Sequence, residues 1–146
     1  MKGDPIPTHD YVARHCRYSD LVYHAGQLIG VSELAFLPRA GEDDGISVNW
    51  AAFFRGGAQH NVAGVRSVTK LNAKDSHRIA LIEVGDLQRA ATPLATLTIT
   101  HDPDDSLPPK ANAAHALIGP VADLNNKQLR QRLATKIRPA DLYPYR

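Results

Sequence analysis

The stretch "HRIALIEV" (residues 77–84) decides the fold, because both of its faces are apolar apart from Glu83. Strands that are buried on both faces carry continuous apolar runs of this kind. We therefore expect residues 78–84 to form the central strand of a sheet. The next apolar run, "LATLTIT" (residues 94–100), alternates between apolar and polar residues, which predicts a neighbouring strand with one inward face.

Working outward from these strands, further segments resemble strands or helices. "DLVYHAGQLIGV" (residues 20–31) is typical of two short strands joined by a tight turn, and "AHALIG" (residues 114–119) of another strand. Apolar residues recur at helical spacing in three other segments, so we expect helices over residues 9–16, 47–57 and 61–72.

A last helix is expected near the end of the sequence. Asp123 is a suitable N-cap, and Pro139 should end the helix because proline cannot continue it. Between them, three apolar residues share one helical face, which should be the buried one: Leu129, Leu133 and Ile137.

The bulk properties predict one ordinary domain. The chain has 146 residues, of which 43% are hydrophobic and 22% charged, values typical of a globular protein with its own core. We expect residues 1–146 to form a single α+β domain. It should have a mixed, mostly antiparallel sheet of about five strands, with residues 78–84 beside residues 95–100 and the helices packed on one face.

The predicted location is the cytoplasm. Cys16 is the only cysteine, so no disulfide can form within the chain, which suits a reducing compartment. No apolar run approaches the roughly 20 residues needed to span a bilayer, and the first residues lack the apolar core of a signal peptide.

His101, Asp102 and His115 form the most suggestive group of chemically active side chains. They flank a proline-rich acidic loop, and if the strands on either side are antiparallel neighbours, both histidines come to the same edge of the sheet. The two histidines would then serve as acid and base, with Asp102 orienting one ring. The alternative is structural: the ring nitrogens bond to loop carbonyls and no pocket exists. We favour the structural arrangement.

No motif predicts a metal or a cofactor. The sequence contains no H-E-x-x-H or C-x-x-C pattern, no glycine-rich phosphate loop and no G-x-S-x-G turn. The expected function therefore uses neither.

The last helix carries a row of basic residues. A solvated outer face explains them most simply, and binding to phosphates or to an acidic partner is the alternative. The residues that would bind are Lys127, Arg130, Arg132, Lys136 and Arg138.

Three short stretches, "GISVNW" (residues 45–50), "ALIEVGD" (80–86) and "THDPDD" (100–105), are followed by a histidine and a basic C-terminal helix. Together they resemble a group of small bacterial proteins that have no assigned activity. The resemblance implies only that the stretches holding Trp50, His101, Asp102 and His115 are worth testing.

These observations predict a non-enzymatic cytoplasmic binding protein that acts through a protein partner. The expectation rests on the lack of any motif tied to a particular reaction. One alternative is a small histidine-dependent phosphodiester hydrolase or nuclease-like enzyme using His101, Asp102 and His115. A second is nucleic-acid binding, without catalysis, through the basic C-terminal helix.

Overall fold

The computed structural model describes residues 2–69, 73–105 and 112–145. In this part of the chain, six strands form one sheet in the order β6-β7-β4-β1-β5-β8, and each neighbouring pair is antiparallel. The prediction of an α+β fold with a mostly antiparallel sheet is therefore confirmed, with one strand more than expected. The strands are β1 (Tyr11–Cys16), β4 (Ile46–Trp50), β5 (Arg78–Glu83), β6 (Thr98–His101), β7 (His115–Gly119) and β8 (Leu142–Pro144).

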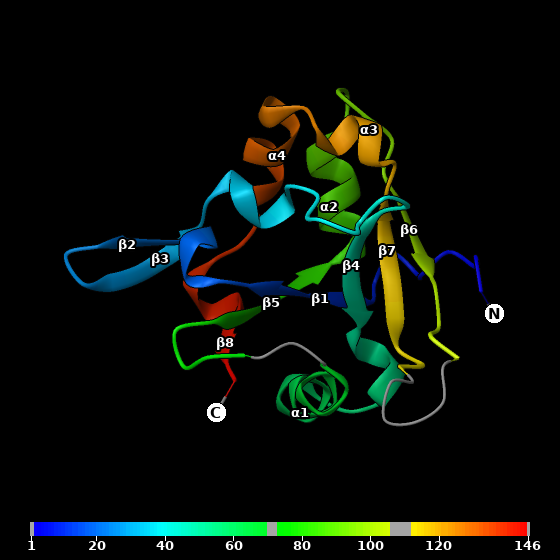
Figure 1. Ribbon diagram of the computed structural model, residues 1–146, viewed down its shortest axis with the longest axis horizontal. Helices are drawn as coiled ribbons and strands as arrows, with labels where there is room; N and C mark the ends of the chain where they lie inside the picture. Colours follow the sequence, from blue (N-terminus) through cyan, green and yellow to red (C-terminus); the bar gives the residue numbers. More distant parts are fainter. Residues whose placement is uncertain (1, 70–72, 106–111, 146) are drawn as a thin grey trace.

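A separate hairpin of two strands, β2 (Leu21–His24) and β3 (Gln27–Val31), projects from one side of the molecule (Figure 1). The two residues of its turn, Ala25 and Gly26, have φ angles of 50° and 78°. Two-residue turns of this left-handed kind match the twist of antiparallel strands. The hairpin predicted for residues 20–31 is thus confirmed.

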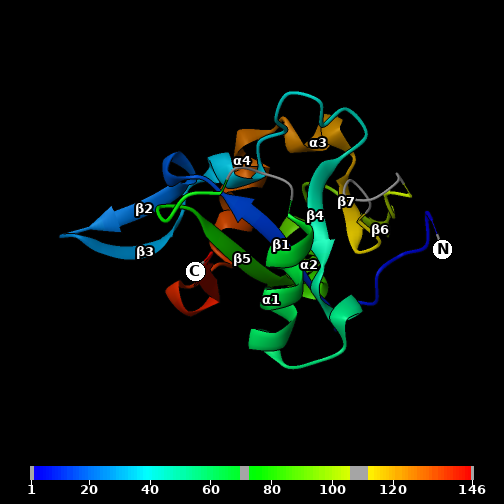
Figure 2. The ribbon, with the colours of Figure 1, turned by 60° about the horizontal axis from the view of Figure 1, so that its bottom comes forward.

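Helices cover both faces of the six-stranded sheet, so the expectation that they pack on one face is wrong. α2 (Val84–Ala91), α3 (Val121–Leu124) and α4 (Lys127–Ala134) lie on one side, and α1 (Ala58–Val68) lies on the other (Figures 1 and 2). The reason is the doubly apolar strand itself. Ala80 and Ile82 join the core under α2 and α4, while Ile79 and Leu81 join a second core with α1.

β5 does not lie beside β6, which corrects the expected strand order. β5 pairs with β1 and β8, and β6 lies at the opposite edge of the sheet, where β7 is its partner. α2 follows β5 directly and carries the chain across the sheet before β6 begins. Proximity in sequence is therefore a poor guide to pairing here.

Two of the expected helices are strands. Residues 11–16 form β1 because their side chains enter cores on opposite faces of the sheet. Val12 and Cys16 belong to one core and Ala13 to the other. Residues 46–50 form β4, in which Ile46 and Val48 are buried, and only the short 3₁₀ turn Ala51–Phe54 follows. In both segments, burial against neighbouring strands overrides the spacing that predicted a helix.

The remaining helix predictions hold in part. α1 (Ala58–Val68) covers residues 61–68 of the expected helix and begins three residues before it, and the expected residues 70–72 lie outside the described residues. The C-terminal helix begins at Lys127 rather than after Asp123, because the side chain of Asn126 accepts hydrogen bonds from two backbone N–H groups and caps it. The helix ends at Ala134 rather than before Pro139. Leu129 and Leu133 on the helix are buried as predicted, and Ile137, which follows the helix, is buried as well.

None of the helices in the described part of the chain is both long and apolar enough to cross a membrane.

Candidate ligand-binding site

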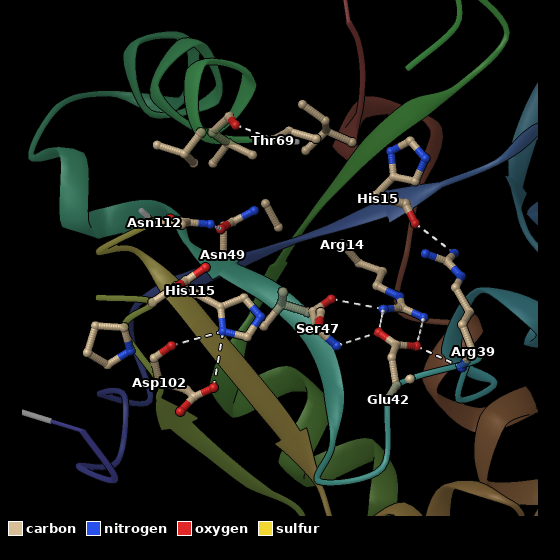
Figure 3. Close-up of a pocket in the computed structure, with 18 of the residues that line it drawn as sticks. Arg14, His15, Arg39, Glu42, Ser47, Asn49, Thr69, Asp102, Asn112 and His115 are labelled. Carbon is tan, nitrogen blue, oxygen red and sulfur yellow. Dashed lines mark hydrogen bonds and ion pairs between the residues drawn. The ribbon is translucent and has the colours of Figure 1, made fainter. Parts of the chain in front are cut away.

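A cavity of about 790 Å³ lies on the face of the sheet that carries α1 (Figure 3). Ala13 and Ile79 from the sheet and Val65 from α1 line it, and all three belong to the core on that side. Residues 39–42 and 102–105 and polar side chains on β4 and β7 add to the lining. We call it the α1-face cavity.

One wall of this cavity lies where β1 and β4 separate. The two strands pair only at Val12–Trp50 and Ala13–Asn49. Beyond that point the backbone of Ser47 bonds to side chains. Its N–H donates to Glu42 Oε2 at 2.6 Å, and its carbonyl accepts from Arg14 Nη1 at 2.9 Å. An ion pair therefore takes the place of a strand partner.

That ion pair is almost completely buried. Arg14 is 1% exposed, and its guanidinium contacts Glu42 at 2.7 Å and donates from Nε to the carbonyl of Ala35. Burial alone would raise the pKa of Glu42, but the hydrogen bond and charge of Arg14 bring that pKa below its ordinary value. The Glu42 carboxylate is therefore ionised, and it bonds to Arg14 and to the backbone N–H of Ser47 beside the cavity.

His115, the first residue of β7, has a fixed ring. Its Nδ1 lies 2.9 Å from the backbone carbonyl oxygen of Asp102 and 3.2 Å from the Oδ2 of the same residue. A carbonyl oxygen can only accept, so Nδ1 carries a hydrogen, and Nε2 of the neutral ring is an acceptor. Figure 3 shows that this second nitrogen points away from Asp102. Both residues line the α1-face cavity.

Asn49 lies directly opposite His115 in the β4–β7 pairing. Its Oδ1 accepts a hydrogen bond of 2.7 Å from Asn112 Nδ2, while Asn112 Oδ1 accepts from the backbone N–H of Ala114. These bonds fix the orientation of the Asn49 amide and leave its Nδ2 as a donor. The cavity therefore presents a fixed donor and a fixed acceptor on adjacent strands, where opposed residues have Cβ atoms about 4.5–5.5 Å apart.

His101 lies outside this cavity lining. It pairs with Ala116, so its side chain faces the side of the sheet opposite that of His115. His101 Nε2 donates to the carbonyl of Ala113 at 2.7 Å, and the ring packs edge-on against Trp50. β6 and β7 are antiparallel neighbours, which is the condition for both histidines to lie at one sheet edge, but the structure does not bring the two imidazoles into one site.

Of the basic residues predicted on the C-terminal helix, some make contacts within the protein and others are exposed. Arg130 is buried, with Nε 2.6 Å from Glu33 Oε2, and Arg132 donates to the carbonyls of Ala90 and Thr92. Arg138 pairs with Asp141. Lys127 and Lys136 are exposed.

His15 and Tyr145 line another part of the cavity and bond to each other through His15 Nδ1 and the Tyr145 hydroxyl. Burial, helped by the nearby charge of Arg39, lowers the pKa of His15 to about 4. Burial also raises the pKa of Tyr145 to about 12. Both groups are therefore uncharged near neutral pH.

Acid should destabilise the protein through His15. Its pKa is about 4 when folded and near the ordinary 6.5 when unfolded, so the unfolded chain takes up the proton first as pH falls. Stability is thus lost between pH 6.5 and 4. After allowing for the partial exposure of His15, we expect the free energy of unfolding to fall by about 2 kcal/mol over this range. Urea unfolding of the parent and of His15→Gln at both pH values should show this difference, with His24→Gln in the exposed hairpin behaving as the parent. Equal pH dependence in the parent and His15→Gln would refute it.

The charges of the lining are largely compensated in the described residues. Three cations line the cavity, and each lies within 4 Å of a carboxylate: Lys2 with Asp102, Arg14 with Glu42, and Arg39 with Asp20. Asp104 and Asp105 also line it, in the same stretch as Asp102. In the described part of the chain, no group of three or more histidine, cysteine or acidic residues is arranged to hold a metal ion.

Sequence reasoning identified Asp102 and His115 but missed Arg14, Asn49 and Asn112. The local signal for Arg14 is an arginine inside the stretch "YVARHC" (residues 11–16), and the structure buries it. The roles of the two asparagines depend on the pairing of β4 with β7, which no local pattern reveals.

Comparisons of the chain with models of protein families, with curated proteins and with solved structures gave no match, so the resemblance to small bacterial proteins stays a prediction.

Proposed function

We propose that this protein binds a small polar molecule, neutral or positively charged, in the α1-face cavity. The observation that carries the proposal is the donor–acceptor pair of Asn49 and His115, each held in one orientation by a second residue. Fixed polar groups in a partly apolar cavity are the usual basis of specific binding of small molecules. A ligand with an adjacent hydrogen-bond acceptor and donor, such as an amide, satisfies both.

The charges favour a neutral or cationic ligand over a phosphate. The cations of the described lining are engaged with carboxylates, and Asp105 adds a negative charge to the same lining as His115. A phosphodiester there would meet like charges without a compensating cation. This charge pattern, together with the outlying position of His101, gives the phosphodiesterase alternative less support than ligand binding.

The proposal keeps the expected binding role and moves it to the α1-face cavity. Action through a protein partner and a cytoplasmic location remain part of the proposal, the latter supported by Cys16, which is buried and unpaired. Nucleic-acid binding has less support, because Arg130 and Arg132 are engaged in contacts within the protein.

Titration of the ¹⁵N-labelled protein with small probes tests the proposal. Acetamide and glycinamide, a cationic amide, should shift the side-chain resonances of Asn49 and the backbone resonances around His115, with dissociation constants of about 1–10 mM, typical of such small fragments. Dimethyl phosphate should shift neither. Asn49→Ala should weaken acetamide binding about tenfold, the loss of one hydrogen bond.

The matched control is Asn61→Ala, because the Asn61 side chain bonds to the Gly56 backbone near the start of α1, outside the cavity lining. This variant should bind the probes as the parent does. Shifts spread over the whole surface, or tighter binding of dimethyl phosphate than of acetamide, would contradict the proposal.

A further inference from the structure

The arrangement around His115 resembles a reaction centre as well as a binding site. Asp102 holds Nδ1 through both its backbone carbonyl and its carboxylate, and this leaves Nε2 able to accept a proton. A histidine oriented by a carboxylate is a common general base, because the carboxylate fixes the tautomer and stabilises the imidazolium that forms.

The amide of Asn49 supplies a second element that such a reaction needs. The Asn49 oxygen accepts a hydrogen bond from Asn112. Asn49 Nδ2 is therefore left as a neutral hydrogen-bond donor on the residue opposite His115. A preorganised donor beside a base stabilises the negative charge that develops on a carbonyl oxygen when water attacks its carbon. The described lining offers no uncompensated cation for a phosphoryl group.

We infer that the α1-face cavity hydrolyses neutral or cationic carboxylic esters or amides, with His115 as general base and Asn49 as oxyanion donor. This inference rests on the proposed function, since the substrate must first bind there. Asp102 acts as a positioning residue. His101, on the other face of the sheet, takes no part.

The reaction balances without a cofactor. His115 Nε2 removes a proton from water as the water oxygen bonds to the carbonyl carbon, and the carbonyl oxygen becomes an oxyanion bonded to Asn49 Nδ2. When the intermediate collapses, the bond to the leaving alcohol or amine breaks. The leaving group takes the proton back from His115, so the products are a carboxylic acid and an alcohol or amine.

The test uses three probes that differ in charge: p-nitrophenyl acetate (neutral), acetylcholine (cationic) and bis(p-nitrophenyl) phosphate (anionic). The parent should hydrolyse the first two and leave the third intact. His115→Gln should lower kcat/KM by about 10²-fold or more, the usual contribution of a general base. Asn49→Ala should lower kcat by about 10²-fold, as the loss of an oxyanion donor does.

Surface histidines cleave p-nitrophenyl acetate slowly without any site, so a matched histidine variant is required. His24 is exposed at the end of β2 and lies outside the cavity lining, and His24→Gln should keep the parent rate. Asp102→Asn should slow the reaction about tenfold and shift the acidic limb of the kcat/KM pH profile, on which the general base becomes protonated, whereas a purely structural role would leave that profile in place. Thermal melting should show that every variant remains folded.

The outcomes separate this inference from the proposed function. If acetylcholine shifts the Asn49 and His115 resonances but the parent cleaves it no faster than His115→Gln does, binding stands and hydrolysis is refuted. If the probe shifts neither resonance, the proposed function fails as well. Cleavage of the phosphodiester in preference to both acetyl esters would overturn the assigned substrate class.

Discussion

Arg14→Met should lower the free energy of unfolding by about 3–5 kcal/mol, the cost of breaking a buried ion pair from one side. The substitution leaves the Glu42 carboxylate, which is 10% exposed, without its cation. It also removes the donors to the carbonyls of Ala35 and Ser47. Methionine is close to arginine in length and apolar, so the loss reports hydrogen bonds and charge more than missing volume.

The matched control is Asp43→Asn, an exposed acidic residue next to Glu42. It should change stability by no more than about 0.5 kcal/mol. Glu42→Gln should be destabilising by an amount similar to Arg14→Met, because each leaves one buried charge unpaired. Urea unfolding measures all three. A loss under about 1 kcal/mol for Arg14→Met would mean that the ion pair does not hold β1 and β4 in place.

Arg130→Met should also cost about 3–5 kcal/mol. Arg130 is 7% exposed and bonds through Nε to Glu33 and through Nη1 to the carbonyl of Leu124, so it ties α4 to the segment Glu33–Phe36 and to α3. Charge reversal at this position would set two carboxylates against each other and should unfold the protein. Loss of any nucleic-acid binding in such a variant would therefore say nothing about a nucleic-acid surface.

Lys127 is the matched control for Arg130, since it lies on the same helix and is exposed. Lys127→Met should stay within about 0.5 kcal/mol of the parent in the same urea titration. If Arg130→Met proved as mild as Lys127→Met, the basic residues of α4 would be surface residues after all, and binding to an acidic partner would regain support.

The strands with strong local signals could be predicted from the sequence. Residues 20–31 carry their own turn, and residues 78–84 are apolar on both faces, a pattern that only an interior strand explains. β1 could not be predicted, because Tyr11, Val12 and His15 also fit a helical face, and only pairing with β4 and β5 decides between the two. Tertiary burial commonly overrides such weak local patterns.

The candidate site shows the same limit. The two histidines were expected at one sheet edge, and Asp102 beside a ring only in the catalytic alternative; the structure places Asp102 in contact with His115. His101 was grouped with them wrongly, since it pairs with Ala116 and so faces away from His115. The partner of His115 is Asn49, distant in sequence, and only the antiparallel register of β4 and β7 brings the two together.

The most direct test of the binding site is a crystal structure of the protein soaked with acetamide. We predict density for one molecule in the α1-face cavity, with its oxygen about 2.9 Å from Asn49 Nδ2 and its nitrogen about 2.9 Å from His115 Nε2, ordinary hydrogen-bond distances. The proposed function would be contradicted if acetamide density appeared at other surfaces and not in this cavity. A His115 ring turned so that Nδ1 no longer contacts Asp102 would contradict it as well.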